Sequence, residues 1–183
     1  MKKEIQLLAI SGSLREKSSN TALMNAIIAL AEEHVRFSVY SGLGELPHFN
    51  PDLDVEEGPA TVGELRRQLK EADGVLICTP EYGNGVPGSL KNALDWIVSS
   101  GEFVNKRVAV VTASPSPMGG DKANASLLLT LNMINAIIVD HGVVMIPHIT
   151  LKMSKEGAIT DEETKQQLLA MLASLGQPHS KAL

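Results

Sequence analysis

Short apolar runs rich in β-branched residues alternate along this chain with longer segments whose apolar positions recur at helical spacing. The short runs predict β-strands at residues 5–10, 35–40, 74–79, 107–113 and 143–146. The longer segments predict helices at residues 21–31, 61–72, 89–99, 121–140 and 161–175. Residues 41–60 follow neither period, and we expect them to form a long loop.

This alternation of strands and helices predicts an α/β fold, with a parallel sheet covered by helices on both faces. Two of the runs, VLICT and VAVVTA, are apolar throughout, as strands buried on both faces should be. The 183 residues fit one domain, and the loop at 41–60 joins elements within it. We therefore expect a single domain over residues 1–183.

Composition narrows the classes of function and the cellular compartment. Apolar residues make up 44% of the chain, enough for a sizeable core, and the net charge of −5 comes without a basic stripe that would suit nucleic acid. The apolar run near the N-terminus ends at Gly12, which is too short for a secretory signal, and no stretch is long enough to span a membrane. The single cysteine, Cys78, cannot form an internal disulfide, so we expect the cytoplasm.

The polar segment SGSLREKSSN at residues 11–20 joins the first strand to the first helix. In an open parallel sheet, ligands bind beyond the carboxyl ends of the strands. The segment offers hydroxyls, an amide, the Arg15 guanidinium and the N–H groups of a helix start, which together suit a phosphate dianion. Both common nucleotide fingerprints are absent, which favours a terminal monophosphate. Alternatively, Ser18, Ser19 and Asn20 only cap the helix, although one such residue is enough for a cap.

Two further connections at the same edge of the predicted sheet have unusual composition. In PEYGNGVPG, at residues 80–88, glycines flank Asn84 and let the backbone approach a flat ring closely, and Tyr82 could pack on it. The alternative for this segment is a tight turn with a buried tyrosine. The third connection, SPSPMGG at residues 114–120, can present backbone N–H groups to the edge of a ring.

The strings GSLREKSSN and PEYGNGVPGSLKNALDW resemble the two signatures of the NADPH-dependent FMN reductase family, and the resemblance covers about residues 5 to 150. It implies a flavodoxin-like three-layer sandwich whose five-stranded parallel sheet has the order 2-1-3-4-5. It also implies non-covalently bound FMN, NAD(P)H as electron donor, and a small acceptor such as a quinone, free flavin, chromate or an azo compound. Members of this family are commonly dimers or tetramers.

The resemblance further implies which residues bind the cofactor. They fall in the three connections: Ser13, Arg15, Ser18, Ser19 and Asn20 at the phosphate; Pro80, Glu81, Tyr82, Gly83 and Asn84 over the isoalloxazine ring; and Ser114 and Gly119 near its other side. The family usually has its asparagine directly after the tyrosine, whereas here Gly83 intervenes. The family's contact with the N5 and O4 edge of the flavin therefore does not carry over directly to Asn84.

The predicted function is transfer of electrons from NAD(P)H through FMN to a small acceptor by a ping-pong mechanism. The flavin carries the chemistry, so no catalytic side chain is required, and the sequence offers no obvious triad. Two alternatives remain: an electron carrier of the flavodoxin type, and a flavin-binding sensor that does not itself oxidise NAD(P)H.

The remaining expectations concern assembly and residues without an assigned role. The helix predicted at 121–140 has almost no polar side, which predicts a homodimer or homotetramer with this helix in the interface. Cys78 should be a core residue, and Trp96 could lie in a subunit interface, in the core or at the surface. None of the five histidines has a partner at metal-ligand spacing, so no metal is expected. The tail QPHSKAL should be frayed.

Overall fold

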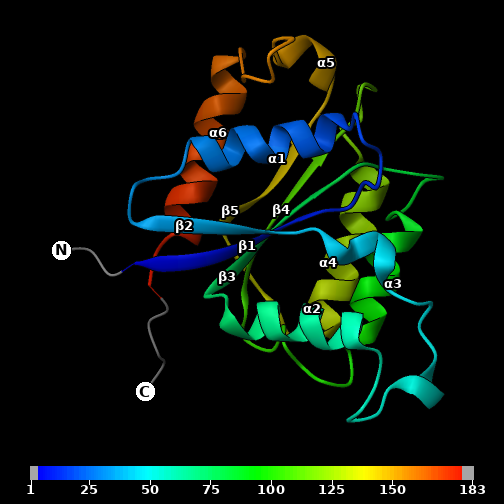
Figure 1. The fold of residues 1–183 in the computed structure, drawn as a ribbon. Coiled ribbons are helices and arrows are strands. Elements are labelled where there is room, and N and C mark those ends of the chain that lie inside the picture. Colours follow the sequence, from blue (N-terminus) through cyan, green and yellow to red (C-terminus); the bar gives the residue numbers. More distant parts are fainter. Residues whose placement is uncertain (1–3, 179–183) are drawn as a thin grey trace.

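The computed structural model describes residues 4–178 and contains one five-stranded, all-parallel sheet (Figure 1). Its strands are β1 (Ile5–Ser11), β2 (Val35–Tyr40), β3 (Gly74–Thr79), β4 (Arg107–Ala113) and β5 (Ile137–Ile146). They pair in the order β2-β1-β3-β4-β5, which confirms the predicted topology. Residues 179–183 of the predicted frayed tail lie outside the described part of the chain.

Helices cover both faces of the sheet, as expected for parallel strands that are apolar on both sides. The helices are α1 (Ser19–Ala29), α2 (Ala60–Glu71), α3 (Gly88–Trp96), α4 (Asp121–Met133), the short α5 (Ile149–Lys152) and α6 (Glu162–Leu175). On β3, Val75 and Ile77 pack in a core with α2, α3 and α4, whereas Leu76 and Cys78 pack with α1 and α6 (Figure 1). Within residues 4–178, no helix has the length and apolar character needed to cross a membrane.

The helix predicted at 121–140 is too long, because α4 ends at Met133. Asn135 takes a left-handed conformation, with φ of 58°, and Ile134 caps the helix. The amide of Ala136 donates to the carbonyl of Leu131 at 2.9 Å, and the amide of Asn135 donates to the carbonyl of Asn132 at 3.0 Å. This pair of bonds is a Schellman motif, in which asparagine is the common substitute for glycine.

The residues after this motif belong to β5, which begins at Ile137 and is longer than the strand predicted at 143–146. Its register with β4 shifts between Val108 and Val110, where His141 has a φ of 56°. The strand therefore bulges in its middle, and only its second half has a clean alternation of buried and exposed residues. The bulge explains why the sequence pattern indicated a strand only from Val143 onward.

The loop predicted at 41–60 contains two short 3-10 helices, Gly42–Glu45 and Pro51–Leu53, and is fixed to α2 and α3. Trp96 of α3 is fully buried, so it is a core residue, and its Nε1 donates to the carbonyl of Pro47 at 2.8 Å. Arg66 of α2 forms an ion pair of 2.7 Å with Asp54, and both side chains are largely buried. Hydrogen bonds from Ser99 and Arg66 hold the pKa of the Asp54 carboxyl below its usual range.

Candidate functional site

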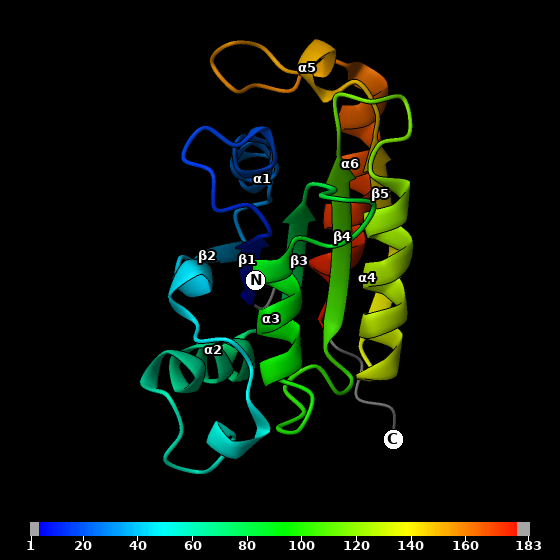
Figure 2. The same cartoon turned by 90° about the vertical axis from the view of Figure 1, so that its right-hand side faces the viewer.

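The three polar connections identified in the sequence begin at the same edge of the sheet. β3 pairs with β1 on one side and with β4 on the other, so their carboxyl ends are adjacent. The last register pairs are Ser11 with Cys78 and Thr79 with Thr112. Figure 2 shows the strands pointing to this end of the molecule, where the connections leave the sheet. The loop after β3 is the middle one of the three.

A close approach between the first two connections depends on Gly12, which the sequence analysis did not single out. Its amide donates to the carbonyl of Cys78 at 2.8 Å. A Cβ atom on Gly12 would lie 2.2 Å from Oγ1 of the buried Thr79, so only glycine fits here. The signal in the sequence is a glycine directly after the first strand, between two serines.

In the first connection, two of the predicted phosphate-binding side chains also have structural roles. Ser18 caps α1 by accepting a hydrogen bond from the amide of Thr21 at 3.3 Å. Asn20 is buried, and its Nδ2 donates to the carbonyl of Ala113 at the end of β4, at 3.1 Å. Arg15 is exposed, and its guanidinium has no hydrogen bond or ion pair with any residue from 4 to 178. Its charge is therefore available to a ligand.

The middle connection contains a tight two-residue turn. Tyr82 and Gly85 exchange two backbone hydrogen bonds of 3.1 Å, and the residues between them have positive φ, 57° at Gly83 and 59° at Asn84. Type I′ turns require positive φ at both central positions, where glycine and asparagine are preferred. The tyrosine is 46% exposed rather than buried, and its Oη lies 3.3 Å from Oγ of Ser13 in the first connection.

The third connection is fixed on both sides. The amide of Ser114 donates to the carbonyl of Ile146 in β5, and the amide of His148 donates to the carbonyl of Ser116. Gly119 and Gly120 follow, with φ of 62° and 84°, and lead into α4. On the other side, Oε2 of Glu81 accepts hydrogen bonds from the first-turn amides of α4, at 2.9 Å and 3.0 Å.

Three side-chain atoms close to this edge are buried without a hydrogen-bond partner among residues 4–178. They are Oδ1 of Asn20, Oγ1 of Thr112 and Nδ2 of Asn124. Buried polar groups are normally paired, so unpaired ones at the junction of three polar loops suit a site that holds a polar ligand. Oδ1 of Asn20 can only accept a hydrogen bond, whereas the hydroxyls of Ser13 and Ser18 and the exposed Arg15 are donors that suit the phosphate of a phosphorylated ring compound.

Other residues with potential chemistry do not join this site. Cys78 is completely buried, and burial raises the pKa of its thiol, so it remains a neutral core residue as predicted. Among residues 4–178, no group of three or more His, Cys, Asp or Glu could hold a metal ion.

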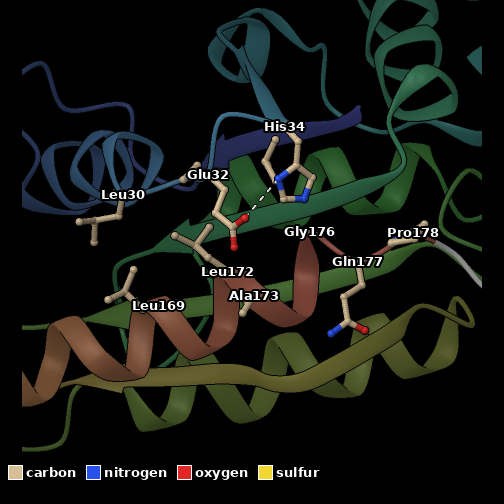
Figure 3. Close-up of a pocket in the computed structure, with 11 residues that line it drawn as sticks. Leu30, Glu32, His34, Leu169, Leu172, Ala173, Gly176, Gln177 and Pro178 are labelled. Carbon is tan, nitrogen blue, oxygen red and sulfur yellow. Dashed lines mark ion pairs between the residues drawn. The ribbon is translucent and has the colours of Figure 1, made fainter. Parts of the chain in front are cut away.

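A cavity of about 470 Å³ lies near the amino end of β2, away from the three connections, between the end of α1, the start of β2 and α6 (Figure 3). Its walls are mainly apolar, with Leu30, Leu169 and Leu172 among them, and an ion pair of 3.4 Å joins His34 to Glu32 at its side. It shares no residue with the three connections and has no cluster of phosphate-binding donors. The three connections are therefore the better candidate for a phosphorylated ligand.

Several known proteins are similar to this chain in sequence and in structure. The sequence model of the NADPH-dependent FMN reductase family matches residues 5–150. A quinone reductase of Escherichia coli is 31% identical, over 97% of this chain and 96% of its own. An NAD(P)H-dependent FMN reductase of Pseudomonas aeruginosa is 30% identical, over 96% of this chain and 95% of its own. The structure of FerB, an NAD(P)H:(acceptor) oxidoreductase of Paracoccus denitrificans, superposes with a TM-score of 0.84 at 30% identity, and covers 93% of this chain and 94% of its own.

The fold and the site thus define a flavodoxin-like flavoenzyme. The chain belongs to the NADPH-dependent FMN reductase family. This confirms the predicted class, an oxidoreductase that uses FMN and takes electrons from NAD(P)H.

The turn in the middle connection gives a direct test of the displaced asparagine. Most residues with a Cβ cost about 1–2 kcal/mol in the left-handed region, and asparagine is an exception because its short polar side chain can form a local hydrogen bond. Gly83→Ala and Asn84→Ala should therefore each lower the free energy of unfolding by about 1 kcal/mol, whereas Asn84→Gly should leave it unchanged. Urea unfolding followed by circular dichroism measures this. Gly85→Ala is the matched control, because Gly85 lacks a positive φ and has room for a Cβ. Equal losses at positions 83 and 85 would contradict the turn assignment.

Proposed function

We propose that this protein passes electrons from NAD(P)H through FMN to a quinone, at the carboxyl edge of β1, β3 and β4. The observation that carries the proposal is the direct linkage of all three connections through the middle one. Tyr82 reaches Ser13 in the first connection, and Glu81 reaches the start of α4 after the third. Support for a quinone as acceptor comes from the relatives named for that activity.

The first connection is the proposed phosphate site. Ser13, Arg15, Ser18, Ser19 and Asn20 surround the start of α1, where backbone N–H groups and the helix dipole favour an anion. Because the Asn20 amide nitrogen already binds Ala113 and the Arg15 guanidinium is exposed, we assign the charged contact to Arg15. The Ser18 hydroxyl accepts the cap bond from Thr21 and keeps its own proton to donate to the phosphate. The Ser13 hydroxyl and the remaining helix N–H groups supply neutral donors.

The ring is proposed to lie between the middle and third connections. Pro80, Glu81, Tyr82, Gly83 and Asn84 form one side, and Ser114 and Gly119 form the other. FMN held there would supply the chemistry of hydride acceptance and of electron transfer in steps of one or two electrons. The protein binds and orients the ring, and the backbone N–H groups of these connections can stabilise negative charge that develops on it. No side chain of the described residues needs to donate or accept a proton.

A pure electron carrier and a flavin-binding sensor are the competing functions. Steady oxidation of NAD(P)H by the purified protein in the presence of a simple benzoquinone would exclude both. Comparison of NADH with NADPH in the same assay gives the donor preference.

We also assign the protein to the cytoplasm, because its one cysteine is buried and cannot form an internal disulfide.

The phosphate assignment predicts that FMN binds much more tightly than riboflavin. Loss of a charged hydrogen bond costs about 1.5–3 kcal/mol, so Arg15→Ala should weaken FMN binding roughly tenfold to a hundredfold and leave riboflavin binding unchanged. Titration by flavin fluorescence measures both. Arg36→Ala is the control, since Arg36 is an exposed arginine of β2 whose partner is Glu4. Equal affinity of the wild-type protein for FMN and riboflavin would refute the phosphate site.

A single exposed face of the ring predicts ping-pong kinetics, because NAD(P)H and the quinone then use the same space in turn. Initial rates measured against NAD(P)H at several quinone concentrations should give parallel double-reciprocal lines. Intersecting lines would mean that both substrates bind together, and the shared-face arrangement would be wrong.

The proposed dimer rests on a smaller apolar surface than the sequence indicated. Much of the predicted helix lies in the protein's own core, because Leu127 and Leu131 are fully buried, and residues 137–139 belong to β5. The large apolar side chains that remain exposed on α4 and the second half of β5, here called the α4–β5 patch, are Leu129, Met133, Val143 and Met145. Ile137 is also exposed, but it pairs with Arg107, whose side chain reaches α6 on the other face of the sheet. In this patch, Leu129 and Met133 are 73% and 58% accessible. An exposed apolar patch is unusual on a soluble monomer. We propose that a second copy covers this patch.

Light scattering at micromolar concentration tests the dimer, and a mass near 19.6 kDa for the wild-type protein would contradict it. Leu129→Lys and Met133→Lys should produce a monomer without loss of folding, because both side chains already face solvent in the single chain. Leu151→Lys, at an 80% exposed leucine of α5 outside the patch, should leave the mass unchanged. Loss of amide protection on α4 upon dilution would give independent support.

A further inference from the structure

Glu81 contacts the protein in a way that its place in the middle connection did not predict. Its Oε2 accepts hydrogen bonds from the amides of Lys122 at 2.9 Å and Ala123 at 3.0 Å. Counted from Gly120, the residue that precedes α4, these are the second and third helical amides. They are the two positions that the side chain of a helix N-cap residue normally satisfies.

Gly120 cannot provide this cap itself, and the structure shows why it must be glycine. It has a φ of 84°, and a Cβ atom would lie 3.2 Å from Cβ of the buried Thr112 and 3.8 Å from Cβ of Glu81. The left-handed backbone and the close packing of this corner both favour glycine here, which has no side chain to cap the helix. Without another acceptor, the first-turn amides of α4 would have no protein partner at a junction where Ala123 is fully buried.

We propose that Glu81 is a positioning residue that acts through α4 rather than a flavin ligand. Its carboxylate caps the helix from a different connection, and so it fixes the third connection, Ser114–Gly120, relative to the middle one. The inference rests on the proposed function in one respect, namely that these two connections lie on either side of the ring. The separation of the two sides of the site is then set by Glu81.

The neighbouring residue strengthens this interpretation. Tyr82 reaches in the other direction, to Ser13 at 3.3 Å. Consecutive side chains of the middle connection therefore link it to both of its neighbours. The Tyr82 link joins two side chains that are free to rotate, whereas the Glu81 link joins a carboxylate to two backbone amides of a helix. Charge assistance and the helix dipole both favour the second link, so it is the stronger constraint on the shape of the site.

Two substitutions at position 81 separate positioning from direct contact. Glu81→Ala removes the acceptor, and we expect FMN binding to weaken about tenfold, the loss that corresponds to one hydrogen bond of about 1.4 kcal/mol. Glu81→Gln keeps a side-chain oxygen that can accept from both amides, so it should recover most of the affinity. In the protein without FMN, hydrogen exchange at Lys122 and Ala123 should speed up in Glu81→Ala and return toward the wild-type rate in Glu81→Gln.

Asp161→Ala is the matched control, because Asp161 caps α6 by accepting from the amide of Thr164 at 3.0 Å, on the other face of the sheet. It should cost similar stability and leave the FMN affinity unchanged. An equal loss of affinity in Asp161→Ala would attribute the effect to general destabilisation and overturn the proposal. Wild-type affinity in Glu81→Ala would also overturn it, as would a Glu81→Gln variant as weak as Glu81→Ala with normal exchange.

Failure of this inference is distinguishable from failure of the proposed function. If the wild-type protein does not bind FMN in the same titration, the flavin site is wrong. The exchange rates of Lys122 and Ala123 would still decide whether Glu81 caps α4. If the wild-type protein binds FMN and the exchange rates do not respond to Glu81→Ala, the cap is wrong and the flavin site stands.

Discussion

The hydrogen-bonded pairing of β3 with β1 on one side and β4 on the other is the constraint on which the site depends. Neighbouring strands lie about 4.8 Å apart, so the carboxyl ends of three adjacent parallel strands span only about 10 Å. Three polar connections therefore leave the sheet close together, although they are separated by up to a hundred residues of sequence. Since β3 is central, side chains of its connection reach both the first connection and the start of α4.

Glycine residues allow the connections to pack this closely. Because glycine has no side chain, other residues must supply the hydrogen bonds that a side chain at that position would form. Gly12 lets the first connection pass against Thr79, and Gly120 lets the start of α4 pass against Thr112. A glycine has no side chain that could cap a helix, so the amides at the start of α4 need an acceptor from elsewhere. The helices α1 and α4 differ in the source of their caps. The start of α1 is capped by its own Ser18, whereas the start of α4 is capped by Glu81 from another connection. The second solution couples the parts of the site.

The sequence was sufficient for those features that local pattern determines. Continuous apolar runs predicted β3 and β4, and polar connections after three strands indicated the end of the sheet at which we propose the site. The end of α4 was missed because the run from Leu127 to Val139 is mainly apolar and gives no clear signal for a break. The residue that ends the helix, Asn135, acts through its left-handed backbone conformation. The bulge in β5 was missed because it depends on the backbone conformation near His141, which the pattern of apolar residues does not reveal.

The roles of individual site residues were less accessible from sequence, because they depend on distant partners. That Asn20 binds the carbonyl of Ala113, 93 residues away, follows only from the pairing of the whole sheet. The cap from Glu81 to Lys122 likewise joins residues 41 positions apart. Residue type indicated which chemistry these connections can perform. Three-dimensional proximity determines which of their groups are already engaged and which have no partner among residues 4–178, such as the Arg15 guanidinium.

The bulge in β5 has a consequence for how this protein behaves at high concentration. β5 is an edge strand, since only β4 pairs with it, and its second half carries the exposed apolar residues Val143 and Met145. A long, regular, apolar edge is a template on which strands of other molecules can assemble into aggregates. Here the ladder is interrupted near His141, so the edge offers two short segments in place of one of ten residues. The irregularity thus protects the folded chain against uncontrolled sheet extension.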